Sequence, residues 1–327
     1  MQRPFLRAAI ALTAALQAIA SASAQSWPTR PVSLVVPFAA GGSVDVMGRI
    51  LAARLSEILG QQVIVENVPG AGGMLGSARV AKASPDGYEF VLGIAGTHAQ
   101  NQTLYKHPLY DAATDFVPVG LIAEQPTVLV TRKDLPPNNL PEFITYAKQN
   151  QARMQYGSAG AGAANHLACV LLDAAIGVNV THVPFRGGGP AMQELLGGRI
   201  DYMCNIVTTA LPQIEAKTVK PIALLSTARS PTLPEVASAK EQGLPDFDAS
   251  TWYAVFLPKG TPAPIVQKLH DALEATVNTP AVQARLKDIG ADLVAPQRRS
   301  PDYLAKFVVS EIARWAAPIR ASGVSMD

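Results

Sequence analysis

Three glycine-rich stretches hold the residues of this chain that could do chemistry. They read FAAGGSVD (38–45), GAGGMLG (70–76) and YGSAGAG (156–162), and each stands between a strand-like run and an expected helix start. The first N–H groups of a helix have no internal partner and carry partial positive charge, and glycine lets an anion approach the backbone closely. The stretches therefore predict backbone sites for an anion. Tight turns without a ligand are the alternative interpretation.

Each stretch misses the enzyme motif that it most resembles. In 70–76 the last glycine falls one residue too late for a dinucleotide-binding fingerprint, and the other two stretches lack the lysine and hydroxyl of a phosphate-binding loop. The stretches around Ser43 and Ser158 each lack one glycine of a nucleophile elbow. No nucleophile, base and orienting group can be assembled from the spacing. The chain is therefore predicted not to be an enzyme, with a serine hydrolase that uses Ser43 or Ser158 as an alternative.

Polar side chains near these turns are candidates to contact the anion. Ser43 and Asp45 open the first helix and are good N-cap types, so Asp45 is predicted equally as a cap or as a ligand contact. Ser158 could bond a ligand oxygen, and Asn205 ends a strand with a neutral amide. Arg186 is a candidate for a bidentate contact with a second carboxylate, and a surface arginine is the alternative.

Two histidines and two large aromatic residues stand beside the same turns. His166 opens an expected helix and His98 follows an expected strand. For both, packing inside the protein is weighed against contact with a ligand, and packing is preferred for His166. Trp252 and Tyr253 lie on an extended segment, where an aromatic ring could close over a ligand or pack in the core. The sequence favours neither alternative for the aromatic pair.

The first 24 residues have the pattern of a secretory signal. MQRPFLR is basic, AAIALTAALQAIA is apolar and SASA is small, which predicts cleavage after Ala24. The apolar run of about 13 residues is shorter than the roughly 20 that span a bilayer, so no membrane insertion of the mature chain is predicted. Export to the periplasm is expected.

Charge and cysteine content narrow the function classes. Without Arg3 and Arg7 of the signal, the chain has 25 basic and 25 acidic residues. The mature chain therefore lacks the positive net charge that binds nucleic acid, and no nucleic-acid partner is predicted. Cys169 and Cys204 are the two cysteines of the chain. In an oxidising compartment they could form a disulfide, and two buried thiols are the preferred alternative. Two cysteines alone do not make a structural zinc site, and neither a metal nor a cofactor is predicted.

Strand-like and helical patterns alternate along the chain, which is typical of an α/β fold with doubly wound, parallel sheets. The extended segment 251–258 and the helices after it have no sheet of their own, so they are predicted to return to the first domain. Domain 1 is thus predicted to comprise 25–122 and 247–327, and an inserted domain 2 to comprise 123–246. A hinge between two such domains predicts a ligand cleft at the carboxyl ends of the strands.

The chain resembles the Bug family, also called TctC-like proteins, over nearly the whole mature length. The matching segments are VVPFAAGGSVDVMGR, VENVPGAGG, SPDGYEF, GTHAQN, YGSAGAGAANHLA, VPFRGGGPAMQELLGGRID and FLPKGTPAPIV. Members of this family are extracytoplasmic solute receptors of tripartite tricarboxylate transporters. The resemblance implies a Venus-flytrap periplasmic binding protein (type II-like) that closes on a small organic carboxylate and delivers it to transporter membrane subunits. A monomer is expected, and a receptor that presents the same acids to a sensor kinase is the alternative.

The resemblance and the turn chemistry together give the predicted ligand-binding residues. The resemblance implies that two loops of domain 1 grip one carboxylate through backbone amides and ordered water, whereas loops of domain 2 receive the variable end of the ligand. The predicted residues are Phe38, Ala40, Gly41, Gly42, Ser43, Asp45, Gly72, Gly73 and Thr97 in domain 1, and Ser158, Ala159, Gly160, Gly162, Asn165, Gly187 and Asn205 in domain 2.

Two positions depart from the pattern of the family. Family members often carry Ser or Thr where this chain has Ala163, so one hydroxyl contact is expected to be absent. They also often carry Asp where this chain has Asn205, and an Asp there could hold a ligand amine. We therefore hypothesise a ligand without an amino group, such as a di- or tricarboxylate or an aromatic acid.

Overall fold

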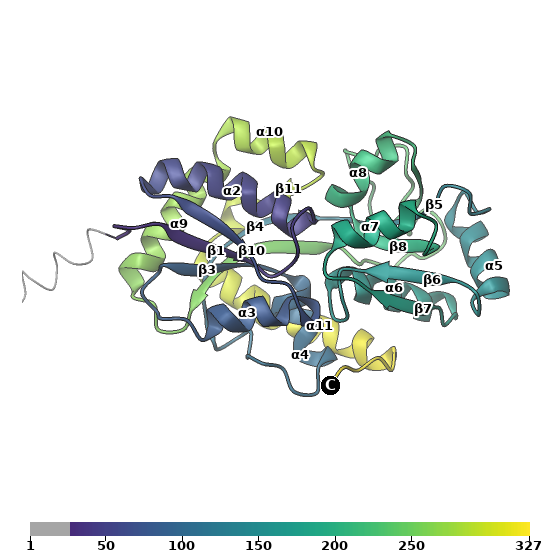
Figure 1. Cartoon of the computed structure of the whole chain (residues 1–327), viewed down its shortest axis with the longest axis horizontal. Coiled ribbons are helices and arrows are strands. Elements are labelled where there is room, and N and C mark those ends of the chain that lie inside the picture. Colours follow the sequence, from purple (N-terminus) through teal and green to yellow (C-terminus); the bar gives the residue numbers. More distant parts are fainter. Residues whose placement is uncertain (1–26) are drawn as a thin grey trace, which may run out of the picture.

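Two lobes lie side by side in the computed structural model, which describes residues 27–327 (Figure 1). The predicted signal at 1–24 therefore lies outside the described residues. Each lobe is built on one β-sheet that has helices on both faces. Among residues 27–327, no helix is both long enough and apolar enough to cross a membrane.

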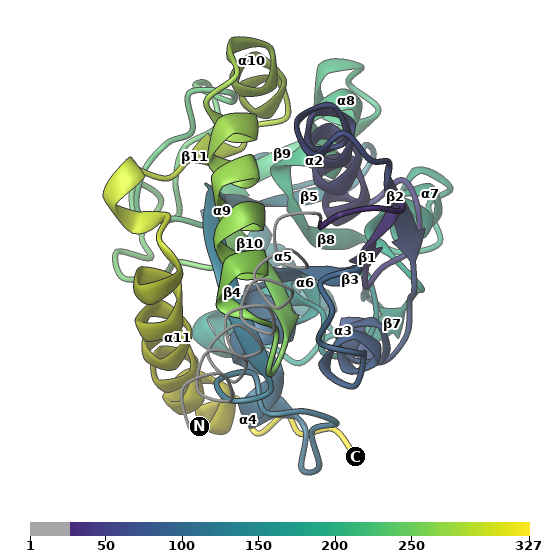
Figure 2. The same cartoon turned by 90° about the vertical axis from the view of Figure 1, so that its left-hand side faces the viewer.

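The first lobe contains a six-stranded sheet in the order β11-β4-β10-β3-β1-β2. Its strands are β1 (Val32–Val36), β2 (Val63–Asn67), β3 (Glu89–Ile94), β4 (Phe116–Gln125), β10 (Thr251–Pro258) and β11 (Asp292–Leu293). One face carries α2 (Ser43–Leu59), α9 (Ala263–Val277) and α10 (Pro280–Asp288) (Figure 2). The other carries α3 (Met74–Ala81), α4 (Asn101–Leu104) and α11 (Pro301–Ala321), with the short turns η1 (Ala71–Gly73), η2 (Gly96–Gln100) and η3 (Pro296–Arg298) in the connections.

The second lobe contains a five-stranded sheet in the order β7-β6-β8-β5-β9. Its strands are β5 (Thr127–Arg132), β6 (Gln155–Ser158), β7 (Thr181–Pro184), β8 (Tyr202–Ile206) and β9 (Val219–Leu224). One face packs against α5 (Leu140–Asn150) and α6 (Ala164–Ile176), and the other against α7 (Gly188–Leu196) and α8 (Val207–Glu215).

Helix α2 shows how the sequence pattern becomes an element that positions a site. Met47, Leu51 and Leu55 recur at helical spacing and are fully buried against the first sheet. The helix begins directly after Gly42 and ends at Gly60, which adopts a left-handed conformation with φ 69°. Its N-terminus therefore points away from the hydrophobic core, at the carboxyl end of β1.

The predicted α/β architecture with two sheets is confirmed, but the sheets are mixed rather than parallel. Strand β10 runs antiparallel to both β3 and β4, and β5 runs antiparallel to both β8 and β9. The antiparallel direction of β10 has a physical reason. Strands β4 and β5 carry the chain out of the first sheet and into the second through the single residue Pro126, and β10 brings the chain back beside β4 in the opposite direction.

Two segments cross between the lobes and lie next to each other. The first crossing is at Pro126, and the second leads from Ala249 into β10, where Thr251 pairs with Gln125. The Thr127 hydroxyl donates a hydrogen bond to the Ala249 carbonyl at 2.8 Å, which ties the two crossings together. A hinge at this position fits the inserted second domain, although the boundaries at 122/123 and 246/247 stay a prediction.

Trp252 and Tyr253 both belong to the core of the first lobe. Trp252 donates from its indole nitrogen to Glu311 at 3.0 Å, and Tyr253 donates from its hydroxyl to Gln125 at 2.8 Å. Both rings are buried on opposite faces of β10. Neither ring can close over a ligand without leaving the sheet, so packing is the correct alternative for this pair.

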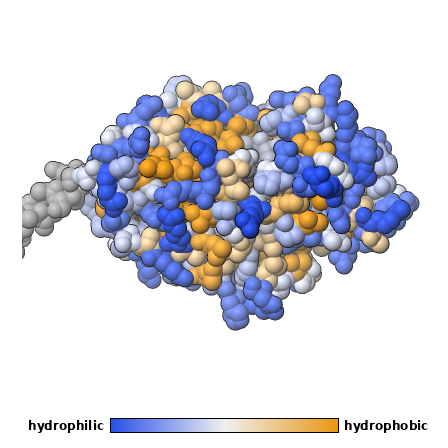
Figure 3. Space-filling model, in the orientation of Figure 1, coloured by the Kyte–Doolittle hydropathy of each residue, from blue (hydrophilic) through white to orange (hydrophobic). Residues whose placement is uncertain are grey.

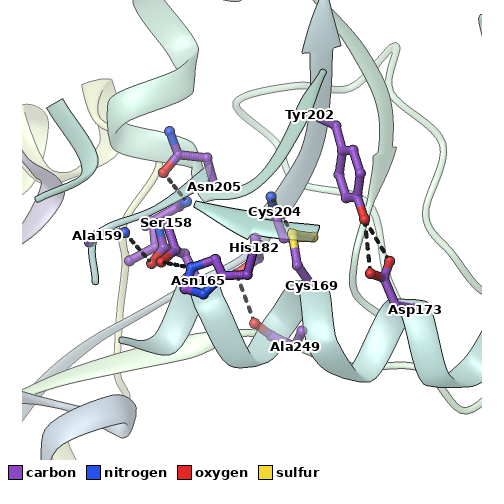
Figure 4. Close-up of a disulfide and its surroundings, with 12 residues drawn as sticks. Ser158, Ala159, Asn165, Cys169, Asp173, His182, Tyr202, Cys204, Asn205 and Ala249 are labelled. Atoms are coloured by element: carbon purple, nitrogen blue, oxygen red, sulfur yellow. Dashed lines mark hydrogen bonds between the residues drawn. A yellow bond between two sulfur atoms is a disulfide. The ribbon is translucent and has the colours of Figure 1, made fainter. Parts of the chain in front are cut away.

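The preferred alternative of two free thiols was wrong and the disulfide alternative is correct, because Cys169 and Cys204 form a disulfide (Figure 4). Helix α6 packs over β8, and this packing brings the two Cα atoms to 5.3 Å, within the range that a disulfide spans. Both cysteines are fully buried, as predicted. The bond joins the helix that carries Asn165 to the strand that ends near Asn205.

Candidate ligand-binding site

A small cavity lies between the lobes, where the N-termini of three helices converge. Its first-lobe wall comes from the loop before α2, the first turn of α2 and the end of β3. Its second-lobe wall comes from the loop after β6, the start of α6, the start of α7, the end of β8 and the first turn of α8. The volume of the cavity is about 20 Å³. The lining residues are Phe38, Gly42, Ser43, Val44, Ile94, Ala159, Ala163, Ala164, Asn165, Gly188, Asn205, Ile206 and Thr209.

The first-lobe wall is held in place by Asp45. This carboxylate accepts hydrogen bonds from the Gly41 N–H, from Arg49 Nε and from Asn67 Nδ2, each at 3.0 Å. Burial alone would raise the pKa of Asp45, but these hydrogen bonds outweigh it and leave the pKa below its usual value. Asn67 Nδ2 also donates to the Phe38 carbonyl at 3.0 Å. Asp45 thus supports the 38–43 loop from behind, and it is not part of the cavity wall.

The second-lobe wall is formed by amide side chains (Figure 4). Asn165 Oδ1 accepts a hydrogen bond from the Ala159 N–H at 3.0 Å, which holds the loop after β6 against the first turn of α6. Asn205 Oδ1 accepts from the Ile206 N–H at 3.0 Å. Because a backbone N–H must meet an oxygen, this bond fixes the orientation of the Asn205 amide.

The Asn205 Nδ2 group is a hydrogen-bond donor of the cavity wall that a ligand could satisfy. Asn205 is 2% exposed and lines the cavity, and its Nδ2 has no hydrogen-bond partner among residues 27–327. A buried amide without a partner costs free energy, so such groups are rare unless something else satisfies them. An oxygen atom of a ligand in the cavity would do so.

Ser158 is engaged behind the wall and does not line the cavity. Its Oγ lies 2.7 Å from His182 Nε2, 3.0 Å from the Gly160 carbonyl oxygen and 3.1 Å from the Gly160 nitrogen. His182 stacks on His166 with ring centroids 4.0 Å apart, and the Gly162 N–H donates to His166 Nδ1 at 3.2 Å. Ser158 and His166 therefore shape the 158–162 loop.

Burial keeps three histidines, His98, His166 and His182, in the neutral form. Burial lowers the pKa of His166 to about 3, with a further contribution from the neighbouring His182, and it lowers the pKa of His182 to about 4. In the first lobe, burial lowers the pKa of His98 to about 3, and this ring stacks on Phe256. Packing is thus the role of His98 and His166.

The remaining glycines of the predicted site lie where the two lobes touch. A Cβ atom added at Gly72 would lie 2.3 Å from the Ala161 carbonyl oxygen of the other lobe, and one added at Gly187 would lie 3.0 Å from the Ala39 Cβ. Gly160 and Gly162 approach the first lobe in the same way. These glycines permit close contact between the lobes.

Other predicted residues flank the cavity. Ala40 and Gly41 are exposed at its rim, and Gly73 packs between the Phe38 ring and the Thr97 methyl group. The Thr97 hydroxyl bonds the backbone of Ile94 and His98 Nδ1, so it is occupied inside the lobe. Thr97 therefore supports the end of β3.

Six of the sixteen predicted residues line the cavity and the others support or flank it. The six are Phe38, Gly42, Ser43, Ala159, Asn165 and Asn205. Sequence reasoning missed Thr209, which lies in the first turn of α8, four residues after Asn205 of β8. It was missed because no helix was predicted there. Sequence reasoning also missed Gly188, although the triple glycine at 187–189 was a visible signal.

No charged side chain lines this cavity among the residues that the structure describes. The Arg186 side chain is exposed, and its backbone carbonyl accepts from the Ala39 N–H at 3.2 Å. The surface alternative is therefore correct for Arg186. Within 27–327, no group of three or more Cys, His, Asp or Glu residues could hold a metal ion.

A family model described as the tripartite tricarboxylate transporter family receptor matches residues 47–324. The chain belongs to this receptor family. Three solved structures have the same fold as this receptor: the periplasmic binding protein BugD, MatC from Rhodopseudomonas palustris with bound malate, and R. palustris Rpa4515 with adipate.

The likeness to these structures covers the whole receptor fold. BugD is 40% identical with a TM-score of 0.88, over 92% of this chain and all of its own. MatC is 40% identical with a TM-score of 0.87, over 90% of this chain and 100% of its own, and Rpa4515 is 36% identical with a TM-score of 0.87, over 91% and 99%. The predicted family and the periplasmic solute-binding fold are thereby confirmed.

Proposed function

We propose that this receptor captures a small dicarboxylate between its lobes in the periplasm and delivers it to the membrane subunits of a tripartite tricarboxylate transporter. The observation that carries the proposal is one cavity lined by both the α2 N-terminus and Asn205, whose Nδ2 has no partner among residues 27–327. None of the described residues in its wall carries a charged side chain. Helix N-termini and neutral amides donate hydrogen bonds, so together they suit a ligand whose two ends are oxygen acceptors.

The first-lobe end of the ligand is a carboxylate that lies on the first turn of α2. Gly42 is the N-cap residue, and the N–H groups of the residues that follow have no partner within the helix. The helix dipole adds partial positive charge at the same place. The Asp45 network holds this loop in one geometry, so the donors are positioned before the ligand arrives.

The second-lobe end of the ligand accepts a hydrogen bond from Asn205 Nδ2. Thr209 and the α7 N-terminus at Gly188 line the same end. An ammonium group would find no carboxylate there among the lining residues, whereas a second carboxylate or a hydroxyl finds donors. The malate and adipate in the two R. palustris structures support a ligand of this class.

Closure of the lobes is part of the proposed mechanism. A cavity of about 20 Å³ holds roughly one water molecule and is far smaller than a dicarboxylate. The lobes must therefore part at the hinge to admit a ligand and then close around it, with the first and second crossings absorbing the backbone change.

A serine hydrolase has little support from the geometry. Ser158 lies 2.7 Å from His182, but it is fully buried, bonds the Gly160 backbone and stays outside the cavity. Ser43 lines the cavity without a histidine among the other lining residues. A receptor for a sensor kinase would use the same cavity and differs only in its partner.

A thermal-shift screen tests the ligand class. The mature protein, stripped of carried-over ligand by partial unfolding, is heated with L-malate, succinate and adipate, and in parallel with L-aspartate and L-glutamate. We expect a rise of several degrees with at least one dicarboxylate and a smaller rise with the amino acids. Stronger stabilisation by aspartate or glutamate would contradict the proposal. Pull-down of the loaded receptor against permease subunits and sensor ectodomains separates transport from sensing.

A further inference from the structure

A buried hydrogen-bond cluster joins the two lobes at the hinge, below the cavity. Gln125 is the last residue of β4, immediately before the first crossing, and it is 1% exposed. Its Oε1 accepts from the Tyr253 hydroxyl at 2.8 Å, which fixes the amide so that Nε2 faces the opposite way. Nε2 donates to the Ile289 carbonyl at 2.5 Å and also contacts the Thr208 hydroxyl.

Thr208 brings the second lobe into this cluster. It lies on the first turn of α8 and is 6% exposed, and its hydroxyl donates to the Ile289 carbonyl of the first lobe at 3.1 Å. The chain comes close at the next residue as well, because a Cβ atom added at Gly290 would lie 2.7 Å from the Val207 side chain. Thr208 is thus the side chain of the second lobe that bonds a backbone carbonyl of the first lobe at the hinge.

The position of this cluster links it to the ligand cavity. Asn205, Ile206 and Thr209 line the cavity, and Thr208 lies within the same short segment. Because α8 belongs to the second lobe and Ile289 to the first, a rotation that parts the lobes at the cavity moves Thr208 relative to Ile289. The Thr208 bond and the cavity wall therefore form and break in the same motion.

We propose that Thr208 is a closure latch: its hydrogen bond to Ile289, supported by Gln125, stabilises the closed arrangement of the lobes without contact with the ligand. Opening exposes the hydroxyl and the carbonyl to water, whereas closing pairs them in a buried site. Loss of one such bond shifts the balance between open and closed forms by about tenfold. Thr208 is a positioning residue, and its effect on ligand affinity rests on the proposed function.

A cross-linking experiment tests the latch without any ligand. The Cβ of Ala39 lies 3.0 Å from the position of a Cβ at Gly187 in the other lobe, and Gly187 has an extended φ of 169° that any residue adopts. The parent protein carries Ala39→Cys and Gly187→Cys, so the rate at which this pair forms a disulfide under mild oxidation reports the closed fraction. Mass spectrometry of the joined peptides measures the rate.

Thr208→Val keeps the shape of the side chain and removes its hydroxyl. We expect this variant to cross-link about tenfold more slowly than the parent, and Thr208→Ser to cross-link at the parent rate because the hydroxyl is restored. Thr218→Val is the matched control, since the Thr218 hydroxyl bonds only Gln213 of its own lobe. Equal rates for Thr208→Val and the parent, or an equally slow Thr208→Ser, would overturn the latch.

Stopped-flow binding of L-malate supplies the second arm. A latch that forms only after closure predicts a dissociation rate about tenfold faster in Thr208→Val with an association rate within twofold of the wild type. A slower association with unchanged dissociation would contradict it. If L-malate and the other acids bind no form of the protein, the proposed function fails, and the cross-linking rates still decide the latch.

Discussion

The two lobes face the same cavity with different chemistry. The first lobe presents the backbone of a helix N-terminus, whereas the second lobe presents the side chains of Asn165, Asn205 and Thr209. A backbone donor is the same whatever residue occupies the position, but a side-chain donor changes with one substitution. In the proposed function, the first lobe therefore supplies a constant hydrogen-bond site for one carboxylate, and the second lobe sets the choice of ligand.

The two walls are also supported differently. Behind the first wall stands an ionised carboxylate, Asp45, with three donors around it. Behind the second stand a buried disulfide and two stacked neutral histidines. On the face that Figure 3 shows, apolar and hydrophilic residues are interspersed over both lobes. Each support can be removed separately.

Removal of the disulfide should give the largest effect. Cys169 and Cys204 are 35 residues apart, and a cross-link of this length stabilises a fold by about 4 kcal/mol in the chain-entropy account. The double variant Cys169→Ala, Cys204→Ala should lower the unfolding free energy by this order, measured by urea denaturation. Hydrogen exchange should rise in α6 and β8 more than in β1. Equal changes in both lobes would show that the disulfide does not act locally.

Substitution of Asp45 should cost somewhat less and act on the other lobe. Asp45→Ala leaves the Gly41 N–H and the Asn67 amide without their acceptor, and hydrogen bonds to a charged group suggest a loss of about 3 kcal/mol in unfolding free energy. Because the pKa of Asp45 is lowered in the fold, its contribution is present above the unfolded pKa and fades as the pH falls through the folded pKa.

Denaturation of Asp45→Ala and of the wild type at several pH values measures this effect. The two proteins should differ most at neutral pH and converge in acid. Asp45→Asn is the matched control, since it keeps one acceptor oxygen and removes the charge. A difference that is independent of pH would argue against an ionised Asp45.

Mild acid should weaken the second lobe more than the first. His166 and His182 have pKa values of about 3 and about 4 in the fold, below the value of an unfolded histidine. Between pH 6.5 and 4 the unfolded chain therefore binds more protons than the folded chain, and the free energy of unfolding falls. Each buried histidine then costs about 2 kcal/mol at pH 5. The first lobe holds one comparable ring, His98. The opening free energy measured by hydrogen exchange should therefore fall by about 2 kcal/mol more in β8 than in β1. Equal losses would contradict the assignment.

Truncation of the Asn205 amide should give the smallest effect on stability and a specific effect on ligand choice. Asn205→Leu removes a donor from the cavity and should weaken binding of a dicarboxylate by about tenfold, measured by calorimetry. Asn205→Asp keeps the size and reverses the chemistry, so it should favour ligands that carry an ammonium group. Unchanged affinity in both variants would mean that the second lobe does not read the ligand through Asn205.

Much of the fold could be predicted from the sequence because its elements are strongly patterned. The alternation of strand-like and helical patterns predicted the α/β class with two sheets, and the glycines of the 38–45 stretch predicted the start of α2 at Ser43. The direction of β10 could not be predicted, since it depends on how the chain crosses the hinge and returns. Helix α8 was missed because it follows β8 without a break and contains Pro212.

The candidate site was harder to predict than the fold. Turn chemistry located the loops, but whether a residue lines the cavity depends on side-chain directions that spacing does not fix. Asp45 and Thr97 illustrate this, because both stand beside the cavity and turn their polar atoms into the lobe. The disulfide was missed for the same reason, since it depends on the register of α6 over β8.

The neutral wall of the cavity has a consequence for the charge of the loaded receptor. Among the described residues, no lining side chain carries a charge that could balance the ligand, and none takes up a proton when the ligand enters. In the proposed function, a bound dianion therefore adds its full charge to residues 27–327, whose 25 basic and 25 acidic residues balance. Empty and loaded receptors would then migrate differently in an electric field, and a membrane partner could tell them apart by electrostatic potential as well as by shape.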